Sequence, residues 1–115
     1  MLNIEKAKQI IKDNYFAESD SFMYLLHERD TFSIEKLNEY TNCITYLTES
    51  TTEHSINILM QLNDTYQYIL RNLLCHFDPS DLHILSNLPQ NYTEYIDELA
   101  RAIGSYGAMI IVDYE

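Results

Sequence analysis

Residues 50–77, STTEHSINILMQLNDTYQYILRNLLCHF, contain the strongest structural signal in the chain. Apolar residues recur on one face at spacings of three and four, which is the pattern of an amphipathic α-helix. These residues are Ile56, Leu59, Leu62, Tyr66, Ile69 or Leu70, Leu73 and Phe77. The opposite, polar face carries Asn57, Gln61, Asp64 and Arg71. The stretch predicts a helix of about 26 residues, roughly 40 Å long, that crosses the whole domain as its scaffold.

The beginning of this helix is predicted from residues 50–53, Ser-Thr-Thr-Glu. In a capping box, a serine side chain accepts a hydrogen bond from the backbone three residues later, and a glutamate at that position bonds back to the serine backbone. Ser50 and Glu53 have this spacing. We therefore expect the helix to begin directly after Ser50.

Two helices are predicted near the amino terminus. Asn3 suits the N-cap position of the first, since its side chain can accept a hydrogen bond from the free backbone donors. The apolar face of this helix consists of Ile4, Ala7, Ile11 and Tyr15. Polar residues 18–21 interrupt the pattern, and a short second helix follows with Phe22, Leu25 and Leu26 as its apolar stripe.

A third helix is predicted after a loop at residues 29–31. Ser33 is expected to cap it. Its buried side is formed by Ile34, Leu37, Thr41, Ile44 and either Leu47 or Thr48.

Residues 78–89 are predicted to end the long helix and to form a short one. Asp78 can act as an N-cap, Pro79 suits the first helical position, and Asp81 favours the positive end of the helix dipole. We expect this short helix to run through Leu85 and to stop before Pro89.

A last helix is predicted to open at residues 91–94, Asn-Tyr-Thr-Glu, which resemble a second capping arrangement. Its inward residues are Tyr92, Tyr95, Ile96, Leu99 and Ile103. Gly104 is expected to close it in the left-handed conformation. The apolar run from Ala108 to Val112 then forms either a buried tail or a short strand.

Together these elements predict an all-α fold: one helical domain over residues 1–115, with about five to six helices around a long central helix and a short C-terminal strand as the alternative for its end. Two prolines, two glycines and 46% hydrophobic residues are typical of a chain that folds.

The charge balance is strongly acidic, with a net charge of −11 and an isoelectric point near 4.5. Residues 1–49 contain 9 acidic and 5 basic residues, whereas residues 50–115 contain 9 acidic and only 2 basic residues. Such a surface repels phosphate backbones and anionic membranes, which disfavours nucleic acid and membrane as partners. The acidity serves either solubility alone or the attraction of a basic partner.

The chemistry expected of the chain is not enzymatic. No pair of histidines has the spacing of two metal ligands on one helix face, and there is no Cys-x-x-Cys motif, so we expect no metal and no cofactor. Cys43 and Cys75 are predicted to be buried, reduced thiols. The first residues lack the apolar run of a signal peptide, and we expect a cytoplasmic protein. The remaining enzymatic alternative uses Cys75 or His54 with nearby carboxylates.

The last predicted helix carries an acidic run, because Glu94, Asp97 and Glu98 share one face with Arg101 one turn further. This face is either a solvated surface on which Arg101 pairs with Asp97 or Glu98, or part of a binding surface. Ten tyrosines without tryptophan favour the second role, since tyrosine is enriched at interface hot spots. The predicted partner-binding residues are Asp78, Asp81, Tyr92, Glu94, Tyr95, Asp97, Glu98, Tyr106, Asp113 and Tyr114.

In size, acidity, helix content and absence of catalytic motifs, the whole chain resembles bacterial immunity proteins, including those paired with contact-dependent growth-inhibition toxins. The resemblance implies a cytoplasmic inhibitor that binds the toxin domain of its own system and occludes the active site. Many such toxins are nucleases with basic substrate grooves, which suits a charge of −11. We expect a monomer or weak homodimer. The alternative is a regulatory or structural module that self-associates through helix packing or its C-terminal segment.

Overall fold

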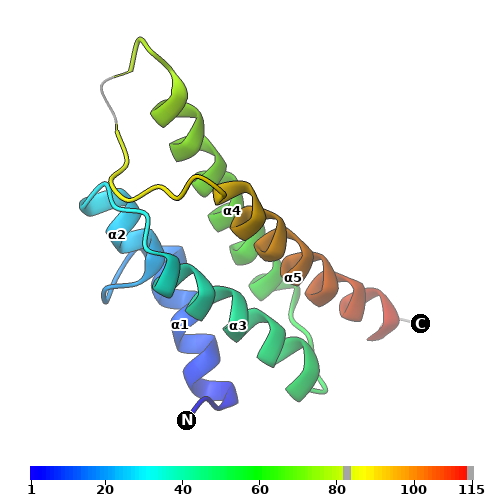
Figure 1. The fold of residues 1–115 in the computed structure, drawn as a ribbon. Helices are drawn as coiled ribbons and strands as arrows, with labels where there is room; N and C mark the ends of the chain where they lie inside the picture. Colours follow the sequence, from blue (N-terminus) through cyan, green and yellow to red (C-terminus); the bar gives the residue numbers. More distant parts are fainter. Residues whose placement is uncertain (82–83, 114–115) are drawn as a thin grey trace.

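The chain forms five helices in the residues that the computed structural model describes, 1–81 and 84–113 without the side chain of Asp113. They are α1 (Ile4–Phe16), α2 (Phe22–Glu28), α3 (Ile34–Ser50), α4 (Ile56–Phe77) and α5 (Tyr92–Asp113). The predicted all-α bundle is confirmed (Figure 1).

The four long helices form a ring around one core. α3 packs against α1 and α5, and α4 packs against the same two helices, so α3 and α4 lie diagonally across the bundle. The short α2 contacts α1, α3 and α4. The most deeply buried side chains include Ile11, Leu26, Ile44, Leu62 and Leu99. Burial of these apolar groups is the main driving force for the fold.

The predicted beginnings of α1 and α3 are confirmed by their caps. The Asn3 side chain accepts a hydrogen bond from the backbone N–H of Lys6 at 2.8 Å. The Ser33 hydroxyl accepts one from the backbone N–H of Lys36 at 3.2 Å. These bonds satisfy backbone donors that have no partner inside the helix, which fixes where each helix starts.

The predicted boundary between α3 and α4 is wrong. α3 continues to Ser50, and α4 begins at Ile56 with Ser55 as its N-cap, so α4 has 22 residues instead of about 26. The Ser55 hydroxyl accepts from the backbone N–H of Ile58 at 3.3 Å, and the Ser55 N–H donates to the Tyr106 hydroxyl at 2.8 Å. The bond to α5 explains why Ser55, and not Ser50, marks the beginning of α4.

The predicted helix from Asp78 through Leu85 is also absent from the described residues, which omit 82 and 83. The Asp78 carboxylate instead accepts hydrogen bonds from the backbone N–H and hydroxyl of Ser80, at 2.9 and 2.7 Å. The segment then returns to the loop before α3, where Phe32 N–H donates to the carbonyl of Ser86 at 2.9 Å (Figure 1). Pairing with a distant loop and burial of Leu85 outweigh the local helix signals.

Gly104 does not end α5, because the helix continues to Asp113 and includes residues 108–112. Neither the strand nor the non-helical tail forms. Tyr106 and Ile110 are 1% and 6% exposed, so their burial favours continuation of the helix over the local preference of glycine for a helix end. Packing does not require glycine at position 107, because a Cβ there would make an ordinary van der Waals contact of 3.4 Å with the Leu59 side chain of α4.

Candidate partner-binding site

An apolar groove lies between the last turns of α4 and the first turns of α5. It has a volume of about 340 Å³. Its lining consists of Leu70, Leu73, Leu74, Phe77, Tyr92, Thr93, Ile96 and Asp97. In Figure 1 this end of α4 extends past the other helices. We call this feature the α4–α5 groove.

Large apolar side chains at the α4–α5 groove are unusually exposed. Leu74 is 73% exposed and Phe77 is 55% exposed. The Phe77 ring lies 5.4 Å from that of Tyr92, which joins the two helices across the groove. Clustered apolar surface of this kind marks an interaction site more often than isolated exposed residues do.

One of the three predicted carboxylates of α5 lines the groove. Glu94, Asp97 and Glu98 are exposed, as predicted for a surface helix face. Asp97 lines the α4–α5 groove, whereas Glu98 lines a separate cavity towards α3. Within the described residues, Arg101 forms no ion pair with Asp97 or Glu98; its Nε donates to the backbone carbonyl of Asp97 at 3.4 Å. The expected pairing is therefore wrong, and both carboxylates keep their charge available.

Two further predicted residues lie beyond the end of α4. Asp78 and Asp81 are both exposed. The hydrogen bonds that Ser80 donates through its hydroxyl and backbone lower the pKa of Asp78, so this carboxylate is ionised at neutral pH. The apolar end of α4 is thus followed directly by negative charge.

The predicted tyrosines do not all lie on the surface. Tyr92 and Tyr95 are half-buried and pack against the core while remaining accessible. The placement of Tyr106 in the partner-binding site is wrong, because it is 1% exposed and its hydroxyl accepts the Ser55 hydrogen bond. Asp113 ends α5, its side chain lies outside the described residues, and so does Tyr114.

Sequence reasoning missed the groove, because the helical pattern placed Leu73 and Phe77 on the inward face and gave no role to Leu74. A signal was present in the width of the apolar stripe. Ile69, Leu70, Leu73, Leu74 and Phe77 together span about 140° of the helix circumference, which is wider than the usual core-facing stripe of about 100°. Such a widening at a helix end indicates apolar surface that the domain itself does not cover.

Neither thiol is activated. Burial, followed by the nearby Glu39 carboxylate, raises the pKa of Cys43 to about 11. Desolvation, followed by a hydrogen bond and charge from Asp81, raises the pKa of the half-exposed Cys75. A reactive cysteine needs the opposite shift. The described residues also contain no group of three or more His, Cys, Asp or Glu side chains that could hold a metal ion.

Comparison with protein-family models, curated proteins and solved structures gives no match for this chain. None of the helices in the described part of the chain combines the length and apolarity needed to cross a membrane.

Proposed function

We propose that the protein is an immunity protein, which binds a basic bacterial toxin domain and neutralises it by covering its active site. One observation carries the proposal: an exposed apolar groove is lined by a carboxylate that has no ion-pair partner among the described residues. Leu74 and Phe77 provide the apolar part and Asp97 provides charge, while Glu98, the next residue of α5, lines a separate cavity.

This arrangement corresponds to the usual anatomy of a protein interface, in which an apolar centre is surrounded by a polar rim. Aromatic anchors at the centre contribute most of the binding free energy, and Phe77 and Tyr92 can serve as such anchors. The carboxylates add electrostatic steering, which raises the association rate with a basic partner. A nuclease groove suits this surface because it is built to bind phosphates.

The proposal includes a cytoplasmic location and a one-to-one complex without nucleic acid. An overall charge of −11 supports both the solubility of the free protein and its repulsion of phosphate backbones. Inhibition by occlusion needs no cofactor and no catalytic residue in this chain.

The decisive experiment determines whether the reading frame immediately upstream encodes a toxin, mixes the protein with that toxin domain, and measures complex formation and toxin inhibition. Glu94→Lys, Asp97→Lys and Glu98→Lys combined should slow association at least about tenfold at low salt, with a smaller effect at high salt. Glu5→Lys, Glu18→Lys and Glu53→Lys combined form the control, since these exposed residues carry the same charge change elsewhere. Absence of a complex would refute the proposal, and equal effects of both triple variants would refute the location.

A second candidate function is self-association, in which the α4–α5 groove covers its counterpart in another copy. The exposure of Leu74 and Phe77 favours it, whereas the carboxylates around them oppose it by mutual repulsion. Light scattering distinguishes the two. A dimer that Phe77→Asp converts to a monomer would favour self-association, and a monomer at all concentrations would exclude it.

A further inference from the structure

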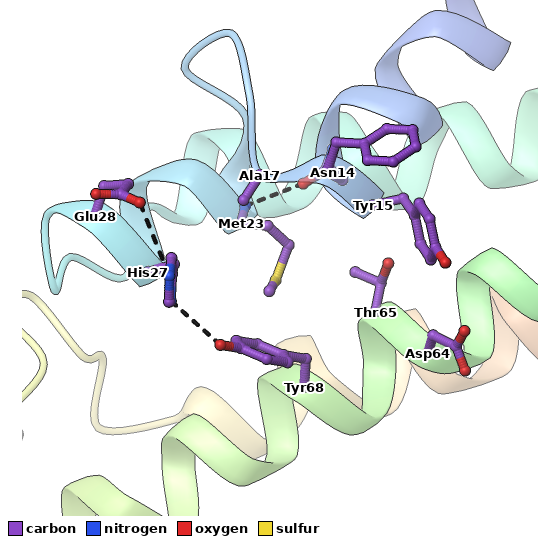
Figure 2. A pocket seen from close by; sticks show the side chains of 10 residues that line it. Asn14, Tyr15, Ala17, Met23, His27, Glu28, Asp64, Thr65 and Tyr68 are labelled. Carbon is purple, nitrogen blue, oxygen red and sulfur yellow. Dashed lines mark hydrogen bonds and ion pairs between the residues drawn. The ribbon is translucent and has the colours of Figure 1, made fainter.

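A second and larger cavity lies where the end of α1, the helix α2 and the middle of α4 meet (Figure 2). Its volume of about 560 Å³ is in the range of small-ligand sites. It is separate from the α4–α5 groove and shares no lining residue with it. We call it the α1–α4 cavity.

Aromatic side chains surround the α1–α4 cavity without being buried in the core. Tyr15, Phe16 and Tyr68 are 39%, 51% and 40% exposed. The rings of Tyr15 and Phe16 meet edge to face, with centroids 5.0 Å apart. Figure 2 shows the ring of Tyr15 extending from α1 towards α4, and Tyr68 projecting from α4. Such rings offer negatively polarised faces to a cation.

The charged groups at the α1–α4 cavity are acidic. Asp64 and Glu28 line it, and no lysine or arginine does. The Asp64 carboxylate has no hydrogen bond or ion pair with any described residue, and the Glu28 carboxylate lies 3.8 Å from the His27 ring. The cavity thus combines an unneutralised carboxylate with aromatic faces.

The walls of the cavity are held in place by hydrogen bonds. The buried Asn14 side chain donates to the carbonyl of Ile10 at 2.9 Å and accepts from the backbone N–H of Met23 at 3.1 Å, which fixes α2 to the end of α1. The hydroxyl of Tyr68 lies 3.3 Å from Nδ1 of His27, which links α4 to α2. Fixed walls reduce the entropy lost when a ligand is bound.

We infer that the α1–α4 cavity is a binding site for a guanidinium group, supplied by an arginine side chain of the basic partner. The inference rests on the proposed function for the source of the arginine, but the site recognises the group itself. Guanidinium is planar, stacks on aromatic rings and offers several donors to the Asp64 carboxylate, whereas Glu28 lies at the opposite side of the cavity (Figure 2). A lysine ammonium is more strongly hydrated and cannot stack in this way, so arginine fits better.

The test uses an acetylated, amidated tetra-arginine peptide and a tetra-lysine peptide of equal charge. Two-dimensional NMR titration of the labelled full chain gives both the binding constant and the residues affected. Tetra-arginine should shift the signals of residues 14–17 and 64–68 and bind at least about threefold more tightly than tetra-lysine. Equal affinities, or shifts spread over every acidic surface, would overturn the inference.

Variants then separate the cavity from general acidity. Asp64→Asn, and Tyr15→Leu combined with Phe16→Leu, should each weaken tetra-arginine binding about three- to tenfold. All three residues are exposed, so the fold should persist, and the nearly isosteric Asp64→Asn keeps the test valid if the double variant unfolds. Glu35→Gln and Met60→Leu are the matched controls, since both residues are exposed and lie outside the α1–α4 cavity and the α4–α5 groove. Equal weakening by these controls would contradict the inference.

The same variants separate this inference from the proposed function. If the toxin complex forms and Asp64→Asn leaves its affinity unchanged, the inference fails while the proposed function stands. If no toxin complex forms but the tetra-arginine results hold, the proposed function fails and the guanidinium site stands. Weakening of the toxin complex by Asp64→Asn, without loss of folding, supports both.

Discussion

The middle and the last turn of α4 differ in their surroundings although their sequence pattern is continuous. In the middle, Leu62 and Ile69 are completely buried in the core, in a helix that packs against α1 and α5. In the last turn, Leu74 and Phe77 are 73% and 55% exposed. The same helical periodicity therefore places apolar side chains in the core along the middle of α4 and in solvent at its end.

This difference indicates what each part does. Leu62 and Ile69 in the middle stabilise the fold, whereas Leu74 and Phe77 in the last turn contribute little to it and remain accessible to a partner. Covering the end would require another helix in the segment between α4 and α5. That segment instead turns back to pair with the loop before α3, which leaves the groove open (Figure 1).

The largest effect should come from truncating a side chain in the buried middle of α4. Ile69→Ala should lower the free energy of unfolding by about 2–5 kcal/mol, because it leaves a cavity in the core. Leu74→Ala should change it by no more than about 0.5 kcal/mol, since the side chain is already exposed. Urea denaturation of both variants measures the contrast. A large loss for Leu74→Ala would show that another molecule or segment covers the end of α4 in solution.

A smaller effect of opposite sign is expected at a polar defect in the core, which involves Thr65 of α4 and Tyr40 of α3. The hydroxyls of Tyr40 and Thr65 are buried and form no hydrogen bond with any described residue. Burial raises the pKa of Tyr40 far above its usual range; the nearby Thr65 hydroxyl lowers it slightly, although the two do not reach hydrogen-bond geometry. Both groups were desolvated on folding without a compensating bond.

Thr65→Val should therefore raise the free energy of unfolding by about 1–2 kcal/mol, because it removes a buried hydroxyl without a partner. Thermal and urea unfolding measure the gain. Thr93→Val at the α4–α5 groove is the control, since Thr93 is exposed and its hydroxyl is already solvated. A loss of stability for Thr65→Val would mean that its hydroxyl is bound in solution.

The sequence predicts the fold class and most helix faces, because these depend on periodicity and local caps. Asn3 and Ser33 cap helices where expected, since nothing distant competes with them. Ser50 and Gly104 do not act as expected, because long-range contacts of Tyr106 and Ile110 decide those positions. The carboxylates of the site were predictable from helix spacing. The groove beside them depends on which parts of each helix are covered by the other helices. The pattern of a single sequence does not contain this tertiary information.

The corrected start of α4 gives a third prediction, about its N-cap. Ser55→Ala should cost about 1 kcal/mol of stability, because it removes the N-cap hydroxyl that accepts from Ile58. Ser50→Ala should cost almost nothing, since Ser50 is an exposed residue in the last turn of α3. Urea midpoints of the two variants provide the comparison. The reverse order of effects would restore the boundary expected from the capping box.

The smallest expected effect concerns the two cysteines, one in the core and one near the exposed end of α4. Cys43 is 1% exposed, and its pKa in the folded protein is about 11 instead of the usual 9.0. Its thiol therefore stays protonated in the folded state at a pH where the unfolded chain already loses the proton. Stability is complete below pH 9 and falls as the pH rises from 9 towards 11.

Between pH 8 and pH 9.5, this group alone should lower the free energy of unfolding by about 0.5–1 kcal/mol. In Cys43→Ala the fall over the same interval should be smaller by that amount, although the variant is less stable at every pH because of the cavity. Cys75→Ala is the control, since the half-exposed Cys75 is screened by solvent and its removal should leave the slope nearly unchanged. Urea denaturation at both pH values gives the two slopes. If Cys75→Ala flattened the slope as much as Cys43→Ala, the end of α4 would be as dry as the core. The contrast between the buried middle of α4 and its exposed last turn would then be lost.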